Sequence, residues 1–103
     1  MEGYAEILAA DRRLVALRLL VEAGGELGES ALEKGLHMYG HRTRVDREVV
    51  RQDLRWMAGL ALPLVALEVA PGDVLIAAIT MRGVSVAQGK IEVEGVAAPA
   101  IGR

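Results

Sequence analysis

The sequence predicts one α+β domain that is mainly helical. Three observations support this class. Apolar residues recur at helical spacing in three segments of the first 60 residues, two apolar runs flank a Pro-Gly-Asp turn, and a short helical segment follows them. The chain has 103 residues, of which 52% are hydrophobic and 25% charged, a composition typical of a globular domain with a single core.

The first helix is expected over residues 4–23, ending at Gly24-Gly25. It carries two apolar strips separated by charged residues. The strips are Ile7, Ala10, Leu14, Leu17 and Val21, and Leu8, Val15 and Leu19, with Asp11, Arg18 and Glu22 between them. Either the strips form one broad buried face, with Arg18 and Glu22 paired along the helix, or the second strip packs against another subunit.

Residues 24–28 are expected to form a turn, and a second helix follows from Glu29 to Tyr39, ended by Gly40. Residues 41–43 link it to a third helix, expected over residues 43–60. Thr43 or Asp46 can cap this helix, and Asp46 is favoured. Two helices joined by a short linker, the second rich in bases, are typical of a helix-turn-helix.

The third helix is predicted to carry a stripe of arginines along one face. Arg44, Arg47, Arg51 and Arg55 recur at spacings of three, four and four, which places them on one side. The opposite side carries Val49, Val50, Trp56, Met57 and Leu60. Such a helix favours a polyanion as partner; the alternative is a solvated face partly neutralised by Asp46 and Glu48.

Two strands are expected at residues 62–69 and 74–79, joined in a hairpin by Pro71-Gly72-Asp73. Thr80 can cap a short final helix over residues 81–88, ended by Gly89. Residues 91–93 suggest a brief strand, followed by a loosely held tail. The order is that of a winged helix-turn-helix: three helices, a β-hairpin wing and a short C-terminal helix. The domain is predicted over residues 1–90, with a C-terminal tail over residues 91–103.

Residues 49–57 (Val-Val-Arg-Gln-Asp-Leu-Arg-Trp-Met), followed by Gly59-Leu60, resemble the recognition helix of DeoR-type winged-helix repressors. Residues 4–8, 11–14 and 80–83, with nearly all of the chain, are similar to small proteins of Mu-like phages and prophages. Those are described as ArsR-like or winged-helix regulators. Two departures stand out: the predicted wing offers Glu68 and Asp73 but no Lys or Arg, and the chain has no cysteine, so ArsR-type metal sensing is not implied.

The remaining polar residues were considered for structural, phosphate-binding, metal-binding and catalytic roles. Asp53 lies by angle among the apolar residues of its helix, so it is expected to pair with an arginine, with Arg18 a candidate, or to cap a helix. Arg12 and Arg13 could add a phosphate clamp. Glu33, His37 and His41 are spaced four apart, but Gly40 interrupts the helix, and no metal site is expected. No cofactor site or catalytic motif is found in the sequence, which favours a protein that is not an enzyme.

The favoured function is a regulator of transcription, of bacterial or phage origin, that binds double-stranded DNA as a homodimer in the cytoplasm. Arg44, Arg47 and Arg51 would enter the major groove or meet its phosphates, with Arg42 and Arg55 at the backbone and Thr43 as a further DNA-binding residue. No secretory signal is evident, and the longest apolar run, residues 60–69, is too short to span a membrane. The alternative is a phage interaction or adaptor module without DNA binding, favoured by the acidic wing, the net charge of −2 and the hydrophobic surplus.

Overall fold

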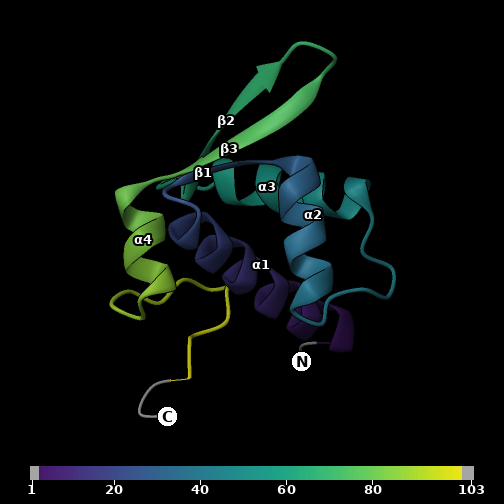
Figure 1. Ribbon diagram of the computed structural model, residues 1–103. Coiled ribbons are helices and arrows are strands. Elements are labelled where there is room, and N and C mark those ends of the chain that lie inside the picture. The colour runs from purple at the N-terminus through teal and green to yellow at the C-terminus, as the bar shows by residue number, and fades with distance from the viewer. Residues whose placement is uncertain (1–2, 101–103) are drawn as a thin grey trace.

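The computed structural model describes residues 3–100, which form four helices and a three-stranded antiparallel sheet (Figure 1). The elements are α1 (Tyr4–Glu22), β1 (Glu26–Gly28), α2 (Glu29–Met38), α3 (Arg47–Ala58), β2 (Val65–Ala70), β3 (Val74–Ile79) and α4 (Met81–Ala87). The α+β class and the predicted order of helices and hairpin are found in the structure. None of the helices described is long and apolar enough to cross a bilayer.

α1 lies between α2 and α4 and contacts both (Figure 1). Its inner side buries Leu14, Ala16, Leu17 and Leu20 in the core. The second predicted strip is only partly covered, because Val15 and Leu19 are half-buried and Leu8 is exposed. The Arg18–Glu22 ion pair of the broad-face interpretation is not formed within residues 3–100.

One strand of the structure was not predicted from the sequence. Residues 24–28 were expected to be only a turn, yet β1 pairs antiparallel with β3, with Glu26 opposite Ala78 and Gly28 opposite Ile76. Three residues next to Gly24-Gly25 are too few to show strand alternation. The partner strand decides their conformation.

α3 is shorter than predicted at its N-terminal end. The sequence placed its start at Thr43, but the helix begins at Arg47, after the Asp46 cap, whose carboxylate accepts a hydrogen bond from the Val49 N–H at 3.0 Å. Arg44 has a positive φ of 62°, a backbone conformation that no helix contains. The cap suggested for Thr43 was therefore wrong and the Asp46 cap is confirmed.

The β2–β3 hairpin (residues 65–79) projects from the helices (Figure 1), and the Pro71-Gly72-Asp73 turn is confirmed. β2 begins at Val65 rather than residue 62. Pro63 has no N–H to give to a sheet, and its carbonyl instead accepts the Thr80 hydroxyl at 2.8 Å. The sheet order is β1-β3-β2, so β3 is central.

α4 begins where Thr80 caps the Gly83 N–H at 3.0 Å, as expected. It lies so close to the chain before β2 that a Cβ on Gly83 would be 2.2 Å from the Leu64 carbonyl oxygen. The strand suggested for residues 91–93 is not formed. Residues up to 100 are also not loosely held: the Ala97 N–H donates to the Ala10 carbonyl at 3.0 Å and Val96 is buried. The predicted tail beyond residue 100 lies outside the described part of the chain.

Candidate nucleic-acid interface

α3 has one side in the core and the other toward solvent. Val50, Leu54 and Met57 are buried, whereas Arg47, Gln52 and Arg55 are exposed. Trp56, predicted to belong to the core, is partly buried, packs against the core and lies beneath Arg13, whose guanidinium is 4.0 Å from the ring centroid. The amphipathic character of this helix is confirmed by its burial.

The four arginines do not form one continuous stripe. Arg44 lies in the loop before α3, so only Arg47, Arg51 and Arg55 share the helix. The prediction of a helical position for Arg44 was wrong. Arg44 has the spacing of a helical residue in the sequence, but α3 starts only after the Asp46 cap, so Arg44 lies outside the helix.

Two of the helical arginines are bound by acids of α2. The Arg47 Nε lies 2.8 Å from Glu33 Oε1, and Arg51 donates from Nε to Glu29 Oε1 at 2.6 Å and from Nη2 to Glu29 Oε2 at 2.9 Å. The matching four-residue spacings on α2 and α3 bring the two pairs into register. Arg51 also donates to the Asp73 carbonyl in the hairpin turn.

Glu29 joins three elements. Its side chain is fully buried and accepts the Leu75 N–H at 2.6 Å as well as the two bonds from Arg51. Hydrogen bonding to Arg51 lowers the pKa of Glu29 below the ordinary value of a glutamate, against the opposing effect of burial, and the Leu75 N–H adds to the lowering. Hydrogen bonding to Glu29 likewise raises the pKa of Arg51. Arg51 therefore links α3 both to α2, through Glu29, and to the turn of the hairpin, through the Asp73 carbonyl.

The remaining predicted DNA contacts, in the α2–α3 loop and in the last turn of α3, are more accessible. Arg42, Thr43, Arg44 and Arg55 are exposed, and within residues 3–100 the three arginine side chains make no hydrogen bond or ion pair. Arg47 is also exposed, with 47% of its side chain accessible, although its Nε is bonded to Glu33. The positive charge that can meet an anion thus lies in the α2–α3 loop and on the outer side of α3.

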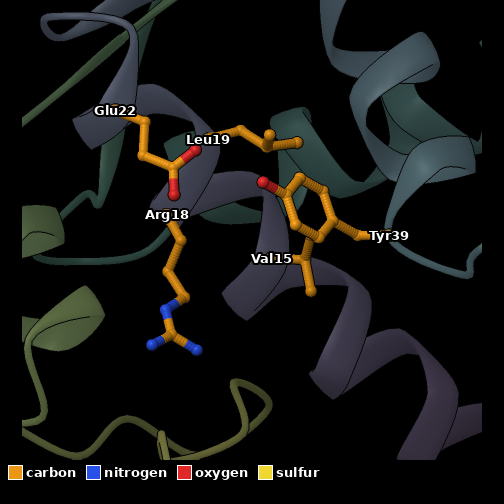
Figure 2. A pocket seen from close by; sticks show the side chains of 5 residues that line it. All are labelled: Val15, Arg18, Leu19, Glu22 and Tyr39. Atoms are coloured by element: carbon orange, nitrogen blue, oxygen red, sulfur yellow. The ribbon is translucent and has the colours of Figure 1, made fainter.

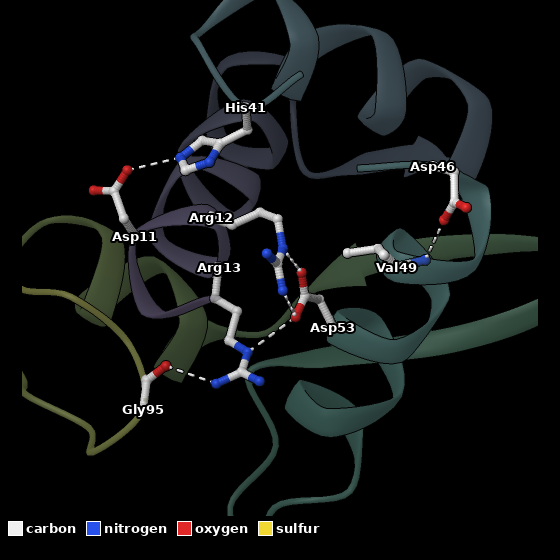
Figure 3. A network of polar contacts seen from close by, with 8 residues as sticks. All are labelled: Asp11, Arg12, Arg13, His41, Asp46, Val49, Asp53 and Gly95. Atoms are coloured by element: carbon white, nitrogen blue, oxygen red, sulfur yellow. Dashed lines mark hydrogen bonds and ion pairs between the residues drawn. The ribbon is translucent and has the colours of Figure 1, made fainter. Parts of the chain in front are cut away.

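Asp53 pairs with arginines of α1, as its predicted burial requires. One partner is Arg12, which donates hydrogen bonds from Nε and Nη2 to the two carboxylate oxygens, and the other is Arg13, whose Nε is 3.1 Å from Oδ1 (Figure 3). The suggestion of Arg18 was wrong, because Arg18 lies on the exposed side of α1. Arg13 also donates to the Gly95 carbonyl at 3.0 Å. Arg12 and Arg13 are therefore engaged inside the protein and are not placed as a phosphate clamp.

The histidines also have structural partners. His37 Nε2 lies 2.6 Å from the Val45 carbonyl, and His41 Nε2 lies 2.7 Å from Asp11 (Figure 3 for the latter). Glu33 is turned toward Arg47. Over the part of the chain that the structure describes, no group of three or more metal-binding side chains comes together.

The hairpin carries no positive charge. Between residues 65 and 79 its charged residues are Glu68 and Asp73, both exposed. Val69 is 63% exposed and Val74 is 38% exposed, so the projecting end is apolar and acidic. Such a tip is repelled by phosphate and attracts an apolar or basic surface.

Comparison with known proteins places the chain in a family. It is 42% identical over 94 residues to a protein of Escherichia phage Mu described as uncharacterized protein gp26, an alignment covering 91% of this chain and 93% of that protein. The chain belongs to the phage Mu gp26 family. A second relative, an uncharacterized protein of Haemophilus influenzae (strain ATCC 51907 / DSM 11121 / KW20 / Rd), is 37% identical over 80 residues, or 78% of this chain and 74% of that protein. No protein-family model and no solved structure matches.

This gp26 family member is organised around two residues whose roles the sequence reading missed. Glu29 was assigned only to the start of a helix, and Arg51 only to a DNA contact. The repeated spacing of four, Glu29 to Glu33 and Arg47 to Arg51, is the signal that could have shown the pairing. It becomes informative only when α2 and α3 are known to be neighbours.

Proposed function

We propose that this member of the gp26 family is a winged-helix protein that binds double-stranded DNA as a homodimer and regulates transcription in the host cytoplasm. The observation that carries the proposal is the group of exposed arginines around the start and outer side of α3. In this arrangement α2 and α3 are the helix-turn-helix and β2–β3 is the wing. The sequence resemblance to phage regulators points in the same direction.

The contacts proposed for DNA are Arg42, Thr43 and Arg44 in the loop and Arg47 and Arg55 on α3. The loop arginines and Arg55 have no intramolecular acid to displace among the described residues. Arg47 must exchange a half-exposed bond to Glu33 for a phosphate, which costs little because such pairs are weak in water. Arg51 mainly positions the wing, because its Nε and Nη2 are taken by Glu29 and the Asp73 carbonyl and only Nη1 is left for an outside anion.

The test is fluorescence anisotropy with labelled duplex DNA over a salt series. A double variant, Arg44→Ala with Arg55→Ala, is expected to weaken binding and to lower the slope of log affinity against log salt by about two units. The matched control is Lys34→Ala with Arg82→Ala, which removes the same charge outside the proposed contacts. Equal affinity and equal slope for the two double variants and the wild type, or no binding at low salt, would exclude the DNA proposal.

A second candidate is a phage adaptor that binds another protein and not DNA. The observation in its favour is the hairpin, whose exposed Val69 and Val74 lie beside Glu68 and Asp73 where a DNA-binding wing would carry bases. A stable complex with a phage protein that Val69→Ser disrupts, together with no DNA affinity at low salt, would select this candidate.

A further inference from the structure

One face of α1 is left uncovered between its two neighbours. A hollow of about 290 Å³ opens between α1 and the end of α2, lined by Val15, Arg18, Leu19, Glu22 and Tyr39 (Figure 2). Tyr39 is 58% exposed, a large fraction for an aromatic ring with apolar neighbours. This face contains Val15 and Leu19 of the second apolar strip of α1, which pack against the core on one side and stay only half-buried.

Arg18 and Glu22 carry opposite charges on this face but do not pair with each other. They lie one helical turn apart, yet Figure 2 shows the Arg18 guanidinium directed away from the Glu22 carboxylate. Across residues 3–100 neither side chain forms an ion pair or hydrogen bond. Both are therefore available to groups outside this chain.

A second hollow, of about 140 Å³, lies on the other side of these two residues. It is lined by Arg18 and Glu22 together with Val21, Ala87 and Gln88, and so is shared with α4. Arg18 and Glu22 thus form a charged ridge, with a hollow on the α2 side and another on the α4 side. A ridge between two hollows is a shape that can fit a rotated copy of itself.

We propose that a second copy of this chain binds here, with the two α1 helices antiparallel about a two-fold axis close to residues 18–22. In a two-fold interface, residue i meets residue j and j meets i, so the surface must complement itself. Opposite charges one turn apart satisfy this requirement, since Arg18 of each copy faces Glu22 of the other. The ridge of each copy enters a hollow of the other, and Tyr39 supplies the apolar contact that favours association.

The inference rests on the homodimer part of the proposed function and names its surface. It is independent of DNA, because the proposed contacts in the α2–α3 loop and on α3 are absent from both hollows. A failure here leaves the anisotropy measurement unaffected. Conversely, a protein that binds no DNA can still form this dimer.

The experiment measures the mass of the intact chain by sedimentation equilibrium over a concentration series. The wild type is expected to dimerise, and Arg18→Glu or Glu22→Arg alone should weaken the dimer about tenfold or more, because each places two like-charged contacts in the interface. The double variant, Arg18→Glu with Glu22→Arg, reverses both charges and is expected to restore the dimer. Lys34→Glu, a charge reversal outside both hollows, should leave the dimer unchanged.

Circular dichroism melting of each variant provides the folding check, and the three positions changed are all exposed, so each variant is expected to fold. A monomeric wild type at every concentration overturns the proposal, as does a dimer that neither single reversal weakens. Single reversals that weaken the dimer without rescue in the double variant overturn the Arg18–Glu22 contact. A partner protein that binds the monomer through Tyr39 would likewise replace the second copy as occupant.

Discussion

Replacing Glu29 by Gln is the sharpest test of how the candidate interface is held together. The change keeps the shape of the side chain but removes the charge that Arg51 and the Leu75 N–H share. A glutamine has one carbonyl oxygen for these donors, so at least one must lose its partner. The amide nitrogen of the glutamine is itself a donor, so it would face the N–H groups of Arg51 or Leu75 without forming a hydrogen bond.

The expected cost follows from these contacts. An orphaned buried N–H costs about 1–3 kcal/mol, and breaking a buried ion pair costs about 3–5 kcal/mol when no water reaches the remaining charge. Arg51 keeps 25% of its side chain exposed and can be partly rehydrated, so the expected loss is about 3 kcal/mol. For a domain of this size that lowers the melting temperature by roughly 10 °C or more.

The matched control is Glu33→Gln, one turn further along α2. Glu33 also pairs with an arginine of α3, but through the single bond from Arg47 Nε, and with 47% of the Arg47 side chain exposed the pair is solvated. The expected loss is below about 1 kcal/mol. Urea unfolding followed by circular dichroism measures both variants, and similar losses for the two would refute the assignment of Glu29 as the buried link between helices and hairpin.

The pH dependence gives a second measurement of the same prediction. The folded pKa of Glu29 is lowered, so its contribution to stability is present above the unfolded value and is lost as pH falls through the lower folded value. The difference in unfolding free energy between wild type and Glu29→Gln should therefore be largest at neutral pH and shrink as pH falls below 4.5. A difference that stays constant over that range would show that the carboxylate charge is not the cause.

Three further outcomes are expected. Glu33→Gln should strengthen DNA binding in the anisotropy assay by a few-fold, because it frees Arg47; weaker binding would argue against a contact by Arg47. Trp56→Ala should cost about 2–3 kcal/mol in urea unfolding, less than for a fully buried ring, since Trp56 is only partly buried beneath Arg13; a loss near zero would contradict its packing. Gly83→Ala should cost about 2–3 kcal/mol because its Cβ would be 2.2 Å from the Leu64 carbonyl oxygen, and an unchanged melting temperature would contradict the close approach of α4.

The elements with long periodic patterns could be predicted from the sequence. α1, α2, the hairpin and α4 were placed within about three residues, because apolar spacing, glycines and the Thr80 cap are local signals. β1 could not be found in this way. Its three residues form a strand only because β3 lies beside them, and a short sequence carries no trace of that partner.

The candidate site was predicted less well, and for a related reason. Side-chain periodicity showed that Arg47, Arg51 and Arg55 share a face of the helix, but it could not show which residues of a neighbouring element contact that face. Glu29 and Glu33 occupy that position only after α2 and α3 pack together. Similarly, the burial of Asp53 could be predicted from its angle on the helix, whereas its partners Arg12 and Arg13 lie 41 and 40 residues away in the chain.

The two acid–arginine pairs between α2 and α3 have the same spacing but different physical character. Arg51 is held by a fully buried carboxylate that also binds the hairpin, so moving Arg51 onto a phosphate would leave that buried charge without its cation. Arg47 can exchange Glu33 for another anion at little cost, since both groups reach water. We therefore expect an anion that meets α3 to be bound mainly by the exchangeable Arg47, by Arg55 and by the loop arginines. This moves the centre of the proposed interface from Arg51 toward Arg47 and the loop before α3, with Arg55 in the last turn of the helix as its far edge.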